Sequence, residues 1–200
     1  MSAPPGCEIK LKLASIICRF AENERYSRRK QKMDYYEEYS VNIGFAVGLD
    51  ENTEFDNLDT RIRQVQYLAS KLDEFGIPYQ RPAGGHAIFV DASKVLTSVP
   101  KEEFPAQTLA IELYLEAGVR GCEIGYILAD RDPVTRENRF GGLDLLRLCV
   151  ARRVYTNNHM DVIAVALKNV FDRRNEINRG VKIVWETELM RHFTVKLEKL

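Results

Sequence analysis

The stretch LLRLCVARRVYTNNHMD, residues 145–161, joins a predicted strand to a predicted helix and sets the register of both. Its apolar beginning is typical of a buried strand. Thr156 or Asn157 then provides the side-chain oxygen that caps the first turn of a helix. One residue does not fit this pattern, because Arg147 lies in the middle of the apolar run.

Two interpretations of Arg147 are open from the residues alone. Leu146 and Leu148 share one face of the strand, so Arg147 could lie on an opposite, solvated face. That face would also carry Leu145 and Cys149, however, and would be fairly apolar. In the second interpretation Arg147 lies at the mouth of a pocket and binds a carboxylate through two parallel hydrogen bonds. Either way the guanidinium needs water or a partner, because an unpaired buried charge is costly.

Three helices are predicted from apolar spacing and from the residues that end them. Apolar residues recur every three or four positions between 55 and 75 and predict a helix that Gly76 ends in the C′ position. Pro105 in the first turn and Gly118 after the last turn bound a second helix. The third helix begins at the cap near residue 157.

Short strands are predicted between the helices, and one more region follows the third helix. The predicted strands are 77–80, 87–92, 119–125, 145–150, 181–186 and 192–198. This order of helices and strands predicts an α+β fold, with helices on one face of a mixed sheet. The residues before about 45 differ in texture and predict an arm that is part strand and part charged helix.

Charge limits the classes of partner. The 200 residues carry 29 basic and 29 acidic side chains, so the formal net charge is zero. That removes the electrostatic argument for nucleic acid or an anionic membrane as the main partner. The basic run SRRKQK at 27–32 keeps a nucleic-acid-binding module open as a hypothesis, although nearby glutamates neutralise it.

The cysteines and the N-terminus indicate a reduced compartment. None of the four cysteines has CxxC or metal-ligand spacing, and Cys122 and Cys149 are expected to be small buried hydrophobes. The start of the chain has no signal-peptide pattern, and no apolar run is long enough to span a membrane. We therefore expect a cytoplasmic protein without a bound metal.

Few other residues point to chemistry. His86 follows two glycines before a strand, and His192 stands beside Phe193 in the last predicted strand. His86 could be a ligand or a base and His192 could line a pocket for a flat substrate, but the residues alone favour a hydrogen-bonded turn role for His86 and a packing role for His192. The sequence contains no nucleophile elbow, phosphate-binding loop, dinucleotide fingerprint or paired-histidine metal motif.

Several segments in the same order resemble the C-terminal part of the tryptophanase family, which includes tyrosine phenol-lyase. They are AVGL, RIRQVQYLASKLDEFGIP, GGHAIFVDA, EEFPAQTLAIELYLEAGVRGCEIG, DRDP, LLRLCVARRVYTNNHMDVI and LMRHFTVKLE. The resemblance covers residues 46–200 and leaves 1–45 as a divergent N-terminal arm. It implies the small C-terminal domain of the aspartate-aminotransferase-like architecture (pyridoxal-phosphate fold type I). The implied activity is β-elimination of L-tryptophan to indole, pyruvate and ammonia.

The resemblance gives Arg147 a ligand. In this family the arginine of the corresponding strand binds the α-carboxylate of the amino-acid substrate. The family pattern Arg-Leu-Thr-Ile-Pro-Arg reads RLCVAR here, with Cys149, Val150 and Ala151 in place of threonine, isoleucine and proline. The arginine is retained.

Three further residues are implied to shape the side-chain pocket. Tyrosine phenol-lyase has an arginine in its ERG segment that recognises the phenol hydroxyl, whereas Ile124 stands here in EIG. An apolar side chain suits an indole and leaves a phenolic oxygen without a donor. His192 resembles the tryptophanase residue near the indole, and Phe193 would add an apolar wall. These residues predict tryptophan, or a related amino acid, as the substrate.

The family motif that anchors the cofactor is not found. Members hold pyridoxal 5′-phosphate through a lysine in a Ser-x-Lys-Lys-Asp segment, and no Lys-Asp dipeptide occurs in this sequence. SRRK, which ends at Lys30, is a poor match. The ligands of the family's potassium ion are not recognised either. We therefore expect a truncated, partial lyase that is inactive by itself.

Two functional hypotheses follow from the resemblance. The first is that the chain is part of an active lyase, as a homo-oligomer or as a lyase subunit. The second is a non-catalytic domain, derived from such a lyase, that binds an amino acid or a partner subunit.

Overall fold

The computed structural model describes residues 35–151 and 154–200, with side chains from residue 43 onward. The chain divides into two units between Asn52 and Thr53. The described part of the first unit is helix α2 (Tyr35–Glu51). Residues 1–34 of the predicted arm lie outside the described residues, and the predicted boundary between residues 45 and 46 stays a prediction.

The second unit contains the three predicted long helices. They are α3 (Phe55–Glu74), α5 (Pro105–Ala117) and α6 (Asn157–Asp172). Gly76 has φ of +68° and Gly118 has φ of +67°, the left-handed conformation that each helix end requires. Thr156 is the N-cap of α6, and its amide donates to Nδ1 of His159 at 3.1 Å. The three helix predictions are therefore confirmed, together with the glycines that end α3 and α5 and the cap that begins α6.

Three strands form one antiparallel sheet in the order β1-β3-β2. Their bounds are β1 (Ala87–Asp91), β2 (Cys122–Ile124) and β3 (Leu145–Cys149). A separate antiparallel hairpin consists of β4 (Val181–Trp185) and β5 (Lys196–Lys199).

The mixed sheet predicted from the sequence is wrong for the described residues, because every strand pair in them is antiparallel. The predicted strand at 77–80 is reduced to a single bridge between Tyr79 and Val90. The last two strands pair with each other and do not extend the first sheet. Strand periodicity predicts which residues share a face of a sheet, but not which strands pair or in which direction.

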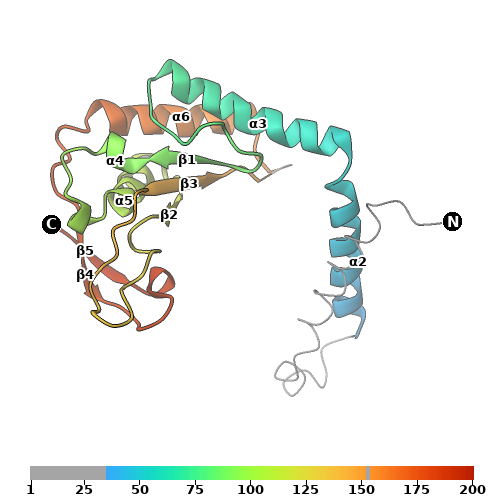
Figure 1. The fold of residues 1–200 in the computed structure, drawn as a ribbon. Helices are drawn as coiled ribbons and strands as arrows, with labels where there is room; N and C mark the ends of the chain where they lie inside the picture. Colours follow the sequence, from blue (N-terminus) through green and yellow to red (C-terminus); the bar gives the residue numbers. More distant parts are fainter. Residues whose placement is uncertain (1–34, 152–153) are drawn as a thin grey trace. The chain divides into compact units, whose positions relative to one another are not determined.

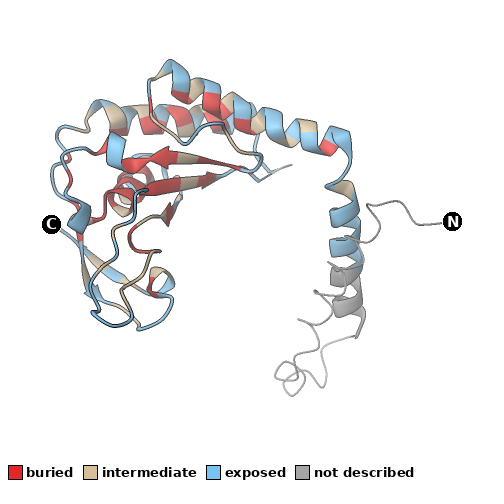
Figure 2. Ribbon diagram, in the orientation of Figure 1, coloured by how far each residue is buried: buried red, intermediate tan, exposed pale blue. Residues whose placement is uncertain are grey.

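The main core lies between one face of the three-stranded sheet and the helices (Figures 1 and 2). Ile88 and Val90 of β1 and Leu146 and Leu148 of β3 provide the sheet side of this core. The helices contribute Val65, Leu68 and Leu72, Leu109 and Leu113, and Met160, Leu167 and Val170. Helices on one face of a sheet, the other part of the fold prediction, are thus confirmed.

A second, smaller cluster holds the hairpin. Phe104, Tyr126, Ile127 and Val181 form its buried centre. Short elements connect these parts: α4 (Ala92–Val95), η2 (Lys101–Glu103) and η3 (Arg191–Phe193). Among the described residues, no helix combines the length and the apolar character needed to cross a bilayer.

Candidate substrate-binding site

Arg147 lies on the sheet face opposite the helices. Its neighbours Leu146 and Leu148 are 0% and 3% exposed and pack into the main core. Strand alternation turns Arg147 the other way, and its side chain is half-buried. Both interpretations of Arg147, as a solvated residue or as a carboxylate-binding residue at the mouth of a pocket, place its side chain on this face.

The surroundings of Arg147 are compatible with a bound anion. Phe89 of β1 and Cys122 of β2 stand directly opposite Arg147 in the register, so the three side chains form one row across the sheet. The Nε atom of Arg147 is buried from solvent and has no hydrogen-bond partner among the described residues. A buried guanidinium nitrogen without an acceptor is costly, and an anion that reached it would remove that cost.

The two cysteines on this face differ from the sequence-based expectation. Cys122 and Cys149 are free thiols, and both are exposed rather than buried. The reason is strand alternation, since both residues share the face of Arg147 and not the face of the core. Their apolar sequence neighbours belong to the opposite face.

Ile124 ends β2 and lies on the same face as Arg147. It pairs with Leu145, while Cys122, two residues earlier, pairs with Arg147. The Ile124 side chain is half-buried. The structure therefore brings two of the four predicted site residues, Arg147 and Ile124, onto neighbouring strands of one sheet face.

Two buried carboxyl groups lie beside Ile124. Glu123 accepts hydrogen bonds from the amides of Ile127 and Leu128, at 3.0 and 3.1 Å. Asp144 accepts from the amides of Ala106 and Tyr126. Burial, together with the nearby Asp144 charge, raises the pKa of Glu123 to about 7, against the lowering effect of the backbone donors. Burial raises the pKa of Asp144 as well. These carboxyl groups hold the turn that follows β2.

His192 and Phe193 do not begin the last strand, as the sequence suggested. They lie in the 3₁₀ turn η3, and β5 starts later, at Lys196. Their rings are 4.0 Å apart between centroids and tilted by 44°. His192 is half-buried and Phe193 is 72% exposed. No described hydrogen bond or ring contact joins either residue to Arg147 or Ile124.

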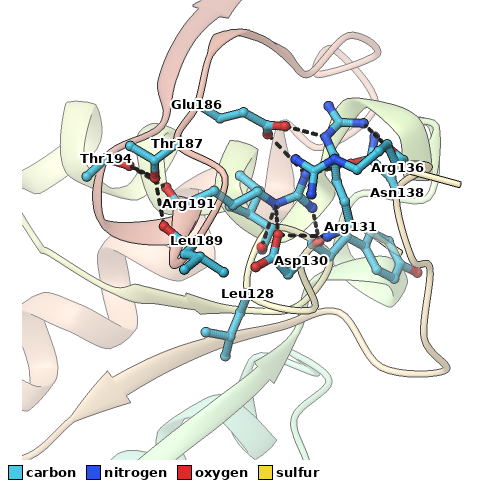
Figure 3. A network of polar contacts seen from close by, with 12 residues as sticks. Leu128, Asp130, Arg131, Arg136, Asn138, Glu186, Thr187, Leu189, Arg191 and Thr194 are labelled. Atoms are coloured by element: carbon cyan, nitrogen blue, oxygen red, sulfur yellow. Dashed lines mark hydrogen bonds and ion pairs between the residues drawn. The ribbon is translucent and has the colours of Figure 1, made fainter. Parts of the chain in front are cut away.

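Arg191, the residue before His192, is fully buried and lies at the centre of a polar network (Figure 3). Its Nε donates to the carbonyl of Ile127 at 2.9 Å, and one terminal nitrogen donates to the carbonyl of Tyr126 at 2.8 Å. The other terminal nitrogen donates to Asn138 at 2.6 Å and to Glu186 at 3.2 Å.

The network extends through a second arginine and a second carboxylate. Asp130 lies 3.7 Å from Nε of Arg191. Arg131 pairs with the other oxygen of Glu186 and donates to the carbonyl of Arg136. Sequence reasoning missed Arg191, because it stands in a polar segment where an arginine is ordinary. Its only signal was the neighbouring motif RHF.

The family resemblance implies two bound groups, pyridoxal phosphate and a potassium ion. Pyridoxal phosphate requires a lysine with a free amine in a pocket. The seven described lysines are all at least partly exposed. Six pair with a carboxylate and Lys196 lies over the ring of Trp185. None of them fits that role, and Lys30 lies outside the described residues. The described part of the chain also has no group of three or more potential acidic, histidine or cysteine metal ligands.

Comparison with known proteins establishes the family to which the chain belongs. The family model of beta-eliminating lyases matches residues 32–166, which is more than half of the chain. The chain therefore belongs to the beta-eliminating lyase family.

Three relatives show how similar the chain is to individual lyases and how much of each it covers. A probable beta-eliminating lyase of Trichomonas vaginalis is 79% identical over 155 residues, which cover 78% of this chain and 34% of that protein. Tryptophanase of Escherichia coli O157:H7 is 46% identical over 155 residues, covering 78% and 32%. Tyrosine phenol-lyase of Nostoc punctiforme is 44% identical over 153 residues, covering 76% and 32%. The chain spans about a third of the length of the curated relatives it matches.

Proposed function

We propose that this chain provides the substrate-carboxylate site of a tryptophanase-like lyase, with Arg147 as the residue that binds the α-carboxylate of L-tryptophan. The observation that carries this proposal is the buried Nε atom of Arg147, which has no acceptor among the described residues. Arg61 of α3 also has a buried Nε without a partner, so the proposal rests on this atom together with the position of Arg147 on the strand that pairs with β2 and Ile124. A carboxylate can accept two parallel hydrogen bonds from a guanidinium, including one from Nε.

Ile124 supports tryptophan over tyrosine. The two named classes of relative are about equally similar, at 46% and 44% identity, so overall identity does not discriminate between them. A phenolic hydroxyl requires a donor or acceptor in its pocket, and isoleucine provides neither. His192 and Phe193 would add a ring pair that suits a flat indole.

The proposal assigns binding, not the elimination step, to the described residues. Pyridoxal phosphate supplies the electron sink for elimination in this family, and no described lysine fits as its anchor. The β-elimination of tryptophan to indole, pyruvate and ammonia is thus proposed for the complete lyase. The placement of residues 46–200 as its small C-terminal domain, and assembly with further lyase subunits, are proposals of the same kind.

The direct test is calorimetric binding of L-tryptophan to the full chain and to Arg147→Ala. A hydrogen-bonded charge pair contributes about 1.5–3 kcal/mol, so Arg147→Ala should weaken L-tryptophan binding by roughly tenfold to a hundredfold. Tryptamine, which has the indole but no carboxylate, should bind the wild type and the variant equally.

Arg120→Ala is the matched control. Arg120 is an exposed arginine two residues before Cys122, so this variant changes the net charge identically and leaves Arg147 in place. It should bind L-tryptophan like the wild type. Equal losses in both variants, or no binding to the wild type, would contradict the proposed carboxylate site.

A further inference from the structure

We propose that Arg191 is a positioning residue that holds the two walls of the side-chain pocket, Ile124 on one side and the His192–Phe193 pair on the other, in a fixed relation. This inference rests on the proposed function, because it assumes that these residues line one pocket. It goes beyond that function by assigning a role in specificity to a residue that touches no substrate.

The first wall is tied through the backbone that leaves β2. Tyr126 and Ile127 follow Ile124 by two and three residues, and their carbonyls accept the hydrogen bonds of the Arg191 guanidinium at 2.8 and 2.9 Å. Glu123 accepts from the amide of the same Ile127 residue. The turn after Ile124 is therefore held from both its amide and its carbonyl sides.

The second wall is tied through the backbone of Arg191 itself. Its carbonyl accepts hydrogen bonds from the amides of Thr194 and Val195, at 2.9 and 2.7 Å, and these close the turn around His192 and Phe193. The Thr194 hydroxyl bonds to the Thr187 hydroxyl at 2.8 Å, and Thr187 also bonds to the carbonyl of Leu189 (Figure 3). The same residue thus anchors η3 by its main chain and β2 by its side chain.

The side chain can do this only as an arginine. Its three nitrogens reach two carbonyls, one amide oxygen and one carboxylate from three parts of the chain. A lysine ammonium is a single point charge and cannot reproduce that planar fork. A buried ion network is weak evidence for stability by itself, since apolar residues of similar volume often serve as well. Its geometric precision is the property that a positioning role uses.

The experiment compares two ligands that share a carboxylate but differ in side chain. Arg147 alone should hold L-alanine, whereas L-tryptophan also needs the two walls. Arg191→Lys should weaken L-tryptophan about tenfold, the range for a disturbed hydrophobic pocket. It should change L-alanine affinity by less than about twofold, because Arg147 is unaltered. Calorimetry of the full chain gives both constants.

Two further variants keep the test decisive. Arg131→Gln removes the other arginine on Glu186 but leaves every bond of Arg191 in place, including the one to Glu186, so the ratio of the L-tryptophan and L-alanine affinities should stay at the wild-type value. If Arg191→Lys does not fold, as judged by fluorescence of the single tryptophan Trp185, then Glu186→Gln replaces it. That variant weakens the bond between Arg191 and residue 186. The ratio of the L-tryptophan and L-alanine affinities should therefore fall, as in Arg191→Lys, by about threefold.

The outcomes separate the two proposals. A selective loss of L-tryptophan supports the positioning role. If a folded variant loses affinity for both ligands equally, or for neither, the positioning role of Arg191 is overturned, while the proposed carboxylate site at Arg147 stands. Failure of both ligands to bind the wild type overturns both proposals.

Discussion

Cys122 and Arg147 face each other across the antiparallel pair β2 and β3, so an exposed thiol stands beside a half-buried guanidinium. Directly opposed residues on antiparallel strands have β-carbons about 4.5–5.5 Å apart. The pair offers a chemical probe of the arginine that requires no knowledge of the substrate.

Cys122 should be alkylated faster by iodoacetate than by the neutral reagent iodoacetamide. In both reactions the thiolate sulfur forms a bond to carbon and iodide leaves, but only iodoacetate carries a carboxylate that Arg147 can attract. An interaction of about 1 kcal/mol raises the rate ratio roughly fivefold. Peptide mass spectrometry measures the ratio at Cys122 in the wild type and in Arg147→Gln. The ratio should fall in Arg147→Gln, and an unchanged ratio would show that the guanidinium is not directed at this face.

Glu123→Gln should flatten the pH dependence of stability. The pKa of Glu123 is 4.5 in the unfolded chain and about 7 in the fold, because burial penalises the charge. The folded state thus binds the proton more tightly. The stabilisation is fully present below pH 4.5 and is lost as the pH rises through 7. A shift of this size corresponds to about 3 kcal/mol.

Urea unfolding of the wild type and Glu123→Gln at several pH values between 5 and 8 measures this effect. The variant should gain stability relative to the wild type as the pH rises, with most of the change complete by pH 8. Glu137→Gln, at an exposed position, is the control and should give a constant difference. A constant difference for Glu123→Gln would mean that this carboxyl is not shifted.

Ile124→Arg should move ligand preference from L-tryptophan toward L-tyrosine. The new guanidinium provides a donor for a phenolic oxygen and places a charge where an indole would pack. The ratio of the two dissociation constants, measured by calorimetry, should change by at least about tenfold. Ile124→Leu preserves an apolar wall and should leave the ratio within about twofold of the wild type. A similar ratio in the arginine variant would exclude Ile124 from the pocket.

Gly180→Ala should destabilise the attachment of the β4–β5 hairpin. A β-carbon at this residue would lie 2.1 Å from the carbonyl oxygen of Glu103, a backbone atom that cannot simply rotate away. Overpacking of this kind costs about 1–3 kcal/mol in the free energy of unfolding. Gly142→Ala, where nothing lies within 4 Å, should change that free energy by less than about 0.5 kcal/mol. Urea unfolding measures both, and equal effects would contradict the close approach of Glu103.

The helices could be predicted from sequence because their signals are local. The stripe that ends at Gly76, and the helix between Pro105 and Gly118, depend on spacing and on backbone freedom within one segment. Strand partners depend on residues far apart in the chain, and there the prediction of a mixed sheet was wrong.

The candidate site divides in the same way. Arg147 was found because a charge in an apolar run is visible in the sequence, and the resemblance supplied a ligand for it. Cys122 and Cys149 were misplaced because apolar neighbours suggested burial, whereas strand alternation exposes them. Arg191 was missed because only the folded chain brings the carbonyls of Tyr126 and Ile127 to its guanidinium.

The sequence by itself thus determined the family, the three long helices and the arginine in the middle of β3. Each of these is encoded in residue identity or in spacing along one segment. Only the tertiary structure decided which face of the sheet is exposed to solvent, which strands pair, and which arginine has hydrogen-bond partners for all of its side-chain nitrogens. Burial and hydrogen bonding are properties of contacts between distant segments. That is why Arg191, with all its nitrogens bonded, is an anchor, and why Arg147, whose buried Nε lacks an acceptor among the described residues, is the candidate for binding a ligand.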